Sequence, residues 1–225
     1  MAGQDIISVP RGYRKRIETF FESIDPNDTN RYIQDWQNLV PRNDREHINR
    51  YRFAYCTVHT SWENSVDQYN VIKRTNTDTT YNTLLRMLKN SSGGMYQIKA
   101  TGIDHLQSLW TNNRQLFSPQ TDNWQSWRTK LSKNLKKLGL AKTSFAIEMI
   151  KPLDAQIICI DRHMFKAFGW ENVDHACSYE QYKYYEDYWV DLSNSFKIPP
   201  VIARNLFWDK IQNQPDSLYW AKYLN

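Results

Sequence analysis

Apolar residues recur at intervals of three and four along nearly the whole chain, which is the spacing of one face of an α-helix. Residues 10–24 are an example, with Tyr13, Ile17, Phe20, Phe21 and Ile24 on one face. Residues 25–28 read as a turn, residues 91–94 as a break, and the short apolar run 156–160 as a connector rather than a strand. The pattern predicts helices over residues 10–24, 32–40, 44–72, 78–88, 96–110, 123–137, 142–151, 161–168, 179–196 and 199–211.

These elements predict an all-α protein of about ten helices, packed at varied angles. A length of 225 residues is enough for one large or two small domains with a substantial core. A mean hydropathy of -0.74 fits a soluble protein. No run approaches the roughly 18 apolar residues of a membrane span, and the N-terminal residues do not resemble a secretory signal.

The cysteines and histidines bear on compartment and metal content. Cys56, Cys159 and Cys177 are widely separated and form no Cys-x-x-Cys pair. An odd count without a secretion signal favours reduced thiols in a cytoplasmic setting. Neither the cysteines nor the five histidines have the spacing of metal ligands, so we expect no metal and no cofactor.

Net charge is +5 and the isoelectric point is near 9.0, which permits a polyanionic partner without requiring one. The positions of the cations say more. One short segment carries Arg128, Lys130, Lys133, Lys136, Lys137 and Lys142. A solvated helix face is the simpler interpretation of such a run, and phosphate contact is the alternative.

Residues 136–142 have the pattern of a helix end, a tight turn around Gly139 and a new helix start. Exposed N–H groups at such a turn, with the positive end of the next helix, can hold a phosphate without reading sequence. Helical hairpins with a glycine turn are also common in proteins that bind no nucleic acid.

Lys142 and Asp161 lie nineteen positions apart, each at the predicted start of a helix. The helix field there disfavours an ammonium group, and a neutral lysine is a nucleophile. A nearby carboxylate can move protons or stabilise a cationic intermediate. A helix of about ten residues with a returning connector would bring both groups to one cleft. The simpler alternatives are a surface charge for Lys142 and a plain helix N-cap for Asp161.

At these residues the chain resembles the helix-hairpin-helix DNA glycosylases, the superfamily with a Gly/Pro…Asp signature. Residues 58–66 are similar to the early helix start of that family, and residues 94–100 to its Gly-aromatic…Lys-Ala motif. The four motifs occur in the family's order and cover roughly residues 45–170. The resemblance implies that Lys142 is the lysine that attacks the sugar C1′, and Asp161 the essential aspartate.

The resemblance also implies a set of DNA-binding residues. The hairpin positions would contact phosphates, the stretch after residue 58 would supply a wedge that fills the gap left by a flipped base, and the two residues after Asp161 would lie near the site. These are Lys136, Lys137, Gly139, Ala141, His59, Thr60, Trp62, Asn64, Arg162 and His163.

The hairpin departs from the family pattern. Members usually have Leu-Pro-Gly-Val-Gly before the lysine, whereas residues 137–141 are Lys-Leu-Gly-Leu-Ala. A shift of the alignment by one residue would place Thr143 at the lysine position. The C-terminal aromatics Tyr185, Trp189 and Trp208 either line the base pocket or pack in the core.

We therefore expect one catalytic unit with a cleft between two subdomains, formed by residues 45–135 and by residues 1–44 plus 136–225. The leading hypothesis is a monomeric, cytoplasmic DNA N-glycosylase that flips a modified base of double-stranded DNA and has lysine Schiff-base lyase chemistry. The second is a bacteriophage relative, acting in the host cytoplasm. It would transfer an amino acid or amine to pyrophosphorylated 5-hydroxymethyluracil in DNA. The candidate target in the DNA is a modified thymine or uracil. The third is a DNA-binding module without catalysis.

Overall fold

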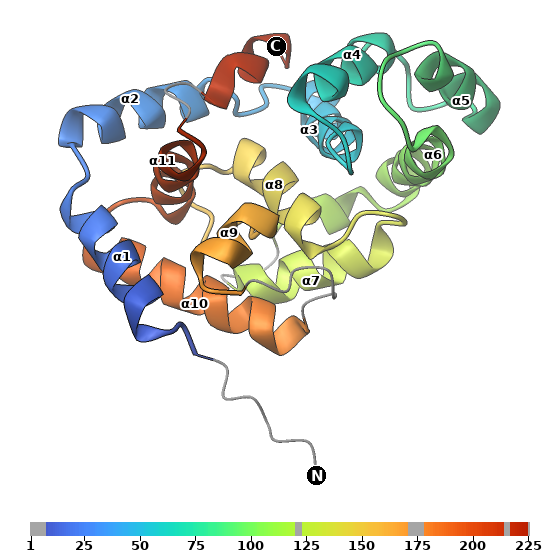
Figure 1. The fold of residues 1–225 in the computed structure, drawn as a ribbon. Helices are drawn as coiled ribbons and strands as arrows, with labels where there is room; N and C mark the ends of the chain where they lie inside the picture. Colours follow the sequence, from blue (N-terminus) through green and yellow to red (C-terminus); the bar gives the residue numbers. More distant parts are fainter. Residues whose placement is uncertain (1–7, 120–122, 171–177, 214–216, 225) are drawn as a thin grey trace.

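The computed structural model describes residues 8–119, 123–170, 178–213 and 217–224, and these residues form eleven α-helices and two short 3-10 helices without a β-strand (Figure 1). The expected all-α architecture of about ten helices is confirmed. Cys177 lies outside the described residues, and Cys56 and Cys159 are free thiols. None of the described helices has the length and apolar character required to span a membrane.

The helices are α1 (Arg11–Glu22), α2 (Pro26–Gln37), α3 (Asp44–Cys56), α4 (Trp62–Ile72), α5 (Tyr81–Lys89), α6 (Tyr96–Asn112), α7 (Trp124–Asn134), α8 (Leu140–Ile150), α9 (Arg162–Ala167), α10 (Tyr179–Ser195) and α11 (Pro200–Gln212), with 3-10 helices η1 (Arg114–Phe117) and η2 (Ser217–Tyr223).

The predicted single helix over residues 44–72 is wrong, because the chain breaks between α3 and α4. His59 has a φ of 50°, in the left-handed region that ends a helix. Thr57 Oγ1 donates to the Ala54 carbonyl at 2.8 Å, and the Ser61 side chain accepts the Asn64 N–H at 3.3 Å. Polar side chains thus satisfy the ends of both helices and stabilise the break.

Residues 25–28, expected to form a turn, instead begin a helix. Asp25 is the N-cap of α2 and accepts the Asn27 N–H at 2.8 Å, while Pro26 occupies the first helical position. The predicted helix 123–137 also ends early, at Asn134, so Lys136 and Lys137 lie in the link between α7 and α8. The N-cap role of Asp161 and the connector at 156–160 agree with the sequence prediction.

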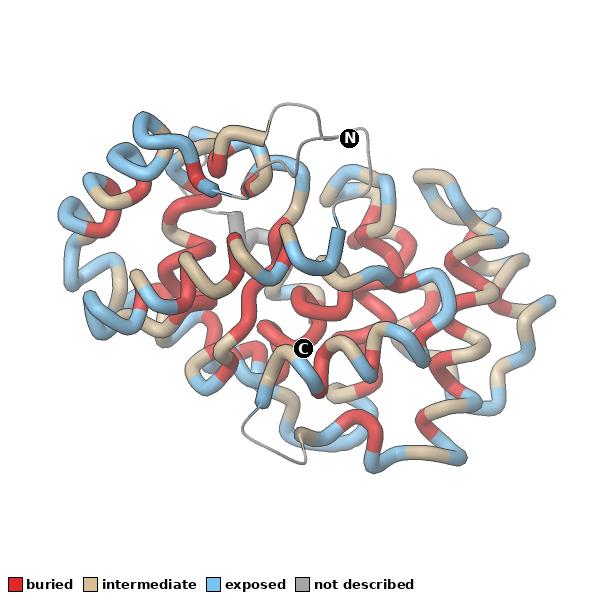
Figure 2. The backbone as a smooth tube through the Cα atoms, turned by 90° about the horizontal axis from the view of Figure 1, so that it is seen from below, coloured by how far each residue is buried: buried red, intermediate tan, exposed pale blue. Residues whose placement is uncertain are grey.

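Two clusters of buried apolar side chains form the core. The first is built mainly from α2 to α8, and the second from α1, α9, α10 and α11. Every residue of α8 from Thr143 to Ile150 is buried, and Figure 2 shows the buried backbone gathered in the interior. The first turn of α8 is therefore held rigidly at the edge of the core. The proposed subdomain boundaries at residues 45 and 136 stay a prediction.

Arg128 belongs to the basic segment that was expected to face solvent or phosphate, but its side chain is fully buried. Its two terminal nitrogens donate to the two carboxylate oxygens of Glu186 on α10, both at 2.9 Å. One of them also donates to Ser144 Oγ at 2.8 Å. Arg128 is thus a structural link between α7, α8 and α10, and its assignment to a DNA-facing surface is corrected.

His47 should make the stability of the fold depend on pH. Its ring packs edge-on against Trp110 at 5.0 Å, and burial, aided by the charge of Lys151, lowers its pKa from 6.5 to about 4. Between these values the unfolded chain binds the proton more readily, so stability is lost as pH falls from 6.5 to 4. The loss is about 3 kcal/mol at most. Urea denaturation of wild type and His47→Phe across this window should show a shallower pH dependence in the variant. If the free energy of unfolding depends on pH equally in wild type and variant, His47 is not the group responsible.

Candidate functional site

A cleft of about 600 Å³ opens at the surface where three chain segments meet. They are the α3–α4 link, the α7–α8 link with the first turn of α8, and the connector that runs into α9. Nine residues expected from the sequence line the cleft: His59, Thr60, Lys137, Gly139, Ala141, Lys142, Asp161, Arg162 and His163. Segments separated by as much as a hundred residues are thus brought to one site.

Lys142 is the third residue of α8 and is half-buried. Its Nζ lies 5.7 Å from the centre of the Phe145 ring, and it has no hydrogen bond or ion pair with another described residue. Thr143, the alternative from a shifted alignment, is fully buried and lines no described cavity. Lys142 is therefore the residue of this turn that presents a reactive group to the cleft.

Asp161 serves both as helix cap and as cleft residue. Its Oδ1 accepts the backbone N–H groups of His163 and Met164, both at 3.0 Å. Its Oδ2 accepts the indole N–H of Trp208 on α11 at 3.1 Å. These three hydrogen bonds fix the orientation of the carboxylate. The cap and the cleft interpretations are compatible, because the first turn of α9 forms one wall of the cleft.

A smaller inner cavity lies behind Lys142 and Asp161, which line it as well as the cleft. Its volume is about 20 Å³, which is room for about one water molecule. Trp220 of η2 fills this region, and its ring stacks on Trp62 with centroids 5.4 Å apart and an interplanar angle of 11°. The outer cleft, in contrast, has the size of a small-molecule pocket.

Three expected DNA-binding residues lie outside the cleft. Trp62 packs against Trp220 and Phe145 instead of lining the cleft, and its role as a wedge stays a prediction. Asn64 lies in the first turn of α4, where its N–H is capped by Ser61. Lys136 is exposed in the α7–α8 link. Its backbone carbonyl accepts the Tyr55 hydroxyl at 2.8 Å.

The α7–α8 link forms a turn as expected, but its left-handed residue is Lys137, with a φ of 64°, rather than Gly139. Gly139 has an extended φ of -77°, and a Cβ added there would meet nothing within 4 Å. It is the N-cap of α8 and offers no side chain to the first-turn N–H groups. Those groups are available to an anion at the positive end of the helix.

A buried lysine holds the α3–α4 link in place. Lys99, from the Gly94–Ala100 motif, donates through Nζ to the Cys56 carbonyl at 2.9 Å and to Gln68 Oε1 at 2.6 Å. Burial lowers the pKa of Lys99 to about 8. These two hydrogen bonds join the end of α3 to α4, so this motif lysine supports the link that carries His59 and Thr60.

A buried ion pair lies beneath the site. Arg204 of α11 pairs with Glu148 of α8, and Glu148 Oε1 also accepts the Cys159 N–H at 2.6 Å. Burial and the charge of Glu148 raise the pKa of the Cys159 thiol to about 12. Cys159 is therefore held as an unreactive thiol.

The cleft carries an excess of positive charge. Lys137, Lys142 and Arg162 line it together with two histidines, and Asp161 is its one acidic lining residue among those described. Such a surface attracts phosphate groups. The lining is completed by Val58, from the stretch expected near the DNA, and by four residues to which the sequence analysis gave no role in the site: Thr57, Ile160, Phe165 and Trp170. These are mostly apolar residues whose position depends on the break after α3 and on the path of the connector.

The fold is that of the helix-hairpin-helix DNA glycosylases. The solved structures that the chain resembles include the 8-oxoguanine DNA glycosylase of Methanocaldococcus jannaschii, with a TM-score of 0.70 over 89% of this chain and 94% of that one. The Methanocaldococcus jannaschii 8-oxoguanine glycosylase/lyase in complex with a 15mer DNA containing 8-oxoguanine has a TM-score of 0.72 over 89% of this chain and 97% of that one. The 8-oxoguanine DNA glycosylase of Thermotoga maritima has a TM-score of 0.69 over 90% of this chain and 97% of that one.

All three of these structures are 17% identical to the chain in sequence. No protein-family model and no curated protein sequence matches it. The structural likeness therefore defines the architecture, while the chemistry must be argued from the residues of the cleft.

Proposed function

We propose that the chain is a DNA N-glycosylase with lyase activity that acts on a modified base in double-stranded DNA. The observation that carries this proposal is the meeting of Lys142 and Asp161, at the starts of α8 and α9, in one positively charged cleft. The likeness in fold to glycosylases, one of them bound to DNA, supports it.

The first-turn N–H groups of α8, with Lys137 and Arg162, would hold backbone phosphates beside the target. The target nucleotide would leave the base stack and enter the cleft of about 600 Å³. The inner cavity of about 20 Å³ does not admit a base unless Trp220 moves. The base would therefore be held in the outer cleft, beside His59, Thr60 and Trp170.

In the chemical step, Lys142 gives up a proton and its Nζ forms a bond to C1′ of the sugar. The glycosidic C1′–N bond breaks, and its electron pair leaves with the base, which takes up a proton. Opening of the sugar ring then gives a Schiff base between Lys142 and C1′. The carboxylate of Asp161 stabilises the positive charge that develops on the sugar. It is also the proton acceptor that this cleft provides for Lys142.

A second candidate is favoured by the cationic lining in front of Lys142, which also suits a pyrophosphate leaving group. In this case the chain would be a phage-type DNA-modification transferase acting in the host cytoplasm. An amine would form a bond to the 5-methylene carbon of the pyrimidine as pyrophosphate leaves, and the glycosidic bond would stay intact.

The deciding experiment incubates the protein with a panel of duplexes, each containing one modified base. Free base and borohydride-trapped protein–DNA adduct are measured first, and nucleosides are analysed by mass spectrometry after nuclease digestion. Released base with a trapped adduct supports the glycosylase. An altered nucleoside with its sugar attached, formed when pyrophosphorylated DNA and an amine are supplied, supports the transferase. Salt-sensitive binding without product, unaffected by Asp161→Asn, indicates a non-catalytic module.

Trp208→Phe should separate catalysis from binding. The variant keeps the aromatic packing but loses the hydrogen bond to Asp161 Oδ2, so the carboxylate is less firmly oriented. We expect the single-turnover rate of base release to fall about tenfold, in line with the loss of one bond to a charged group, with unchanged DNA affinity. Trp110→Phe is the matched control, because Trp110 is 7% and Trp208 9% exposed and Trp110 lines no described cavity. Equal rates in the two variants would contradict a positioning role for Trp208.

A further inference from the structure

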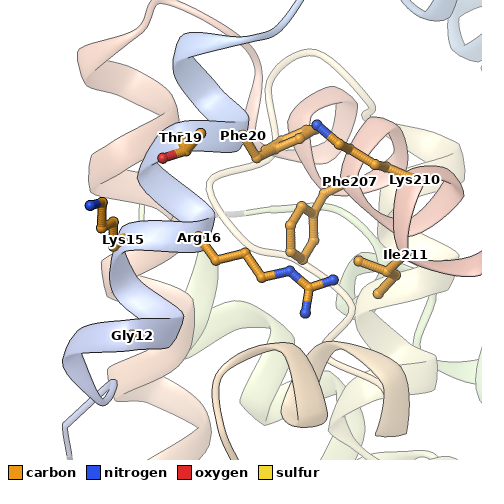
Figure 3. A pocket seen from close by; sticks show the side chains of 8 residues that line it. All are labelled: Gly12, Lys15, Arg16, Thr19, Phe20, Phe207, Lys210 and Ile211. Carbon is orange, nitrogen blue, oxygen red and sulfur yellow. The ribbon is translucent and has the colours of Figure 1, made fainter.

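A second cavity, of about 380 Å³, lies between α1 and α11 and shares no lining residue with the cleft (Figure 3). Its charged lining residues are Lys15 and Arg16 of α1 and Lys210 of α11, and no acidic side chain lines it. Phe20 and Phe207 form its floor, with ring centroids 4.8 Å apart in an edge arrangement. We call this positively charged cavity the α1–α11 pocket.

The two cations that flank the floor are available to a ligand. Figure 3 shows the Arg16 guanidinium directed into the space beside the Phe207 ring. Arg16 has no hydrogen bond or ion pair with any described residue. Lys210 lies across the Phe20 ring, 5.4 Å from its centre, and donates to Ser23 Oγ at 3.3 Å. A free guanidinium opposite an ammonium group is an arrangement that binds phosphate.

Two contacts join the rim of the α1–α11 pocket to the rim of the cleft. Gln212, directly after the last α11 residue that lines the pocket, has its Nε2 2.7 Å from Nδ1 of His163, which lines the cleft. At the other end, Tyr13 of α1 packs so closely on Gly169 that a Cβ there would lie 2.8 Å from its ring. Gly169 precedes Trp170, another cleft residue. Residues next to the pocket thus contact the cleft and its immediate neighbours in sequence, so the two sites lie close together.

We propose that the α1–α11 pocket binds a backbone phosphate of the DNA strand that flanks the nucleotide held in the cleft. The inference rests on DNA being the ligand of the cleft, as proposed above. Its basis is charge complementarity and proximity, because backbone charges repeat at short intervals along a strand that leaves the cleft. Phe20 and Phe207 are only 6% and 2% exposed, so the floor offers little ring surface to a stacked base. This favours a backbone contact over a free nucleotide.

The test compares Arg16→Ala/Lys210→Ala with Arg86→Ala/Lys89→Ala. The control removes the same charge from exposed residues of α5, which Figure 1 shows at the opposite end of the molecule from α1. Fluorescence anisotropy measures affinity for a duplex with a central tetrahydrofuran abasic-site analogue at several salt concentrations. We expect the pocket variant to bind about tenfold more weakly at low salt, and the magnitude of the slope of log K against log salt to fall by about 1, the value for one phosphate contact. The control should match wild type, and Arg16→Lys should keep the slope.

Two truncated duplexes, each lacking the flank on one side of the analogue, locate the contact. The penalty of the pocket variant should vanish on one truncated duplex and persist on the other. Equal affinity and slope for variant and wild type on the full duplex would overturn the proposal. An equal penalty on both truncated duplexes would overturn it too, because the contact would not be with a flank. The proposal would also be overturned if the pocket variant lost binding to a free nucleoside monophosphate, measured by calorimetry, and kept its affinity for DNA. A wild-type protein that binds no duplex would instead overturn the proposed function itself.

Discussion

Replacement of Lys142 by alanine is expected to abolish borohydride-dependent cross-linking to DNA and to lower base release by at least about 10³-fold. The variant removes the cleft amine that stands in the first turn of α8, where it has no hydrogen bond or ion pair with a described residue. Its fold should survive, since alanine is the better helix former and the lost contact with the Phe145 ring is worth about 0.5–1 kcal/mol. Lys151→Ala, at the exposed C-terminal end of the same helix, is the matched control and should trap DNA like wild type.

Asp161→Asn complements this experiment because it removes charge and keeps structure. Asparagine caps a helix about as well as aspartate, so α9 should stay formed and the thermal midpoint nearly unchanged. Loss of the carboxylate should slow base release by about 10²–10³-fold. Asp161→Ala would add a capping loss of about 1 kcal/mol. An adduct that survives Lys142→Ala, or full activity in Asp161→Asn, would refute the proposed chemistry.

Local rules of sequence were enough to find the two residues to which we assign the proposed chemistry. Asp161 was identifiable as a helix cap, and the turn before Lys142 as a helix start, because both depend on residues within one helical turn. Their meeting in one cleft followed from the length of α8 and its returning connector. These features do not require knowledge of distant partners.

Other features escaped prediction because their cause lies far away in the chain. The local caps at Thr57 and Ser61 give only a weak signal that α3 ends at Cys56. The end also depends on Lys99, which binds the Cys56 carbonyl from forty-three positions downstream. Arg128 resembles its exposed lysine neighbours, and only Glu186, fifty-eight positions away, makes it a buried residue. The α1–α11 pocket joins the two ends of the chain, which lay outside the recognisable motifs.

The buried pair of Arg128 and Glu186 leads to the largest expected effect on stability. Both side chains are fully buried, and Glu186 Oε1 also accepts the Ile158 N–H at 3.0 Å, within the connector that leads to Asp161. Glu186→Ala would leave the Arg128 guanidinium buried without its counter-charge and the Ile158 N–H without its acceptor. Loss of one partner of a buried pair costs about 3–5 kcal/mol, so urea denaturation should show a loss of this size.

Two comparisons separate the lost charge pairing from the lost side-chain volume. Asp187→Ala removes the neighbouring acid of α10, whose pair with Lys183 is at the surface, and should cost about 1 kcal/mol or less. The double variant Arg128→Met/Glu186→Leu replaces both charges by apolar groups and should regain much of the stability that Glu186→Ala loses. If the double variant is as unstable as Glu186→Ala, the pair is not the source of the effect. Because this pair fixes α10 to the connector, its loss should also make the position of Asp161 in the cleft less well defined. Base release should therefore fall at urea concentrations below those that unfold the protein.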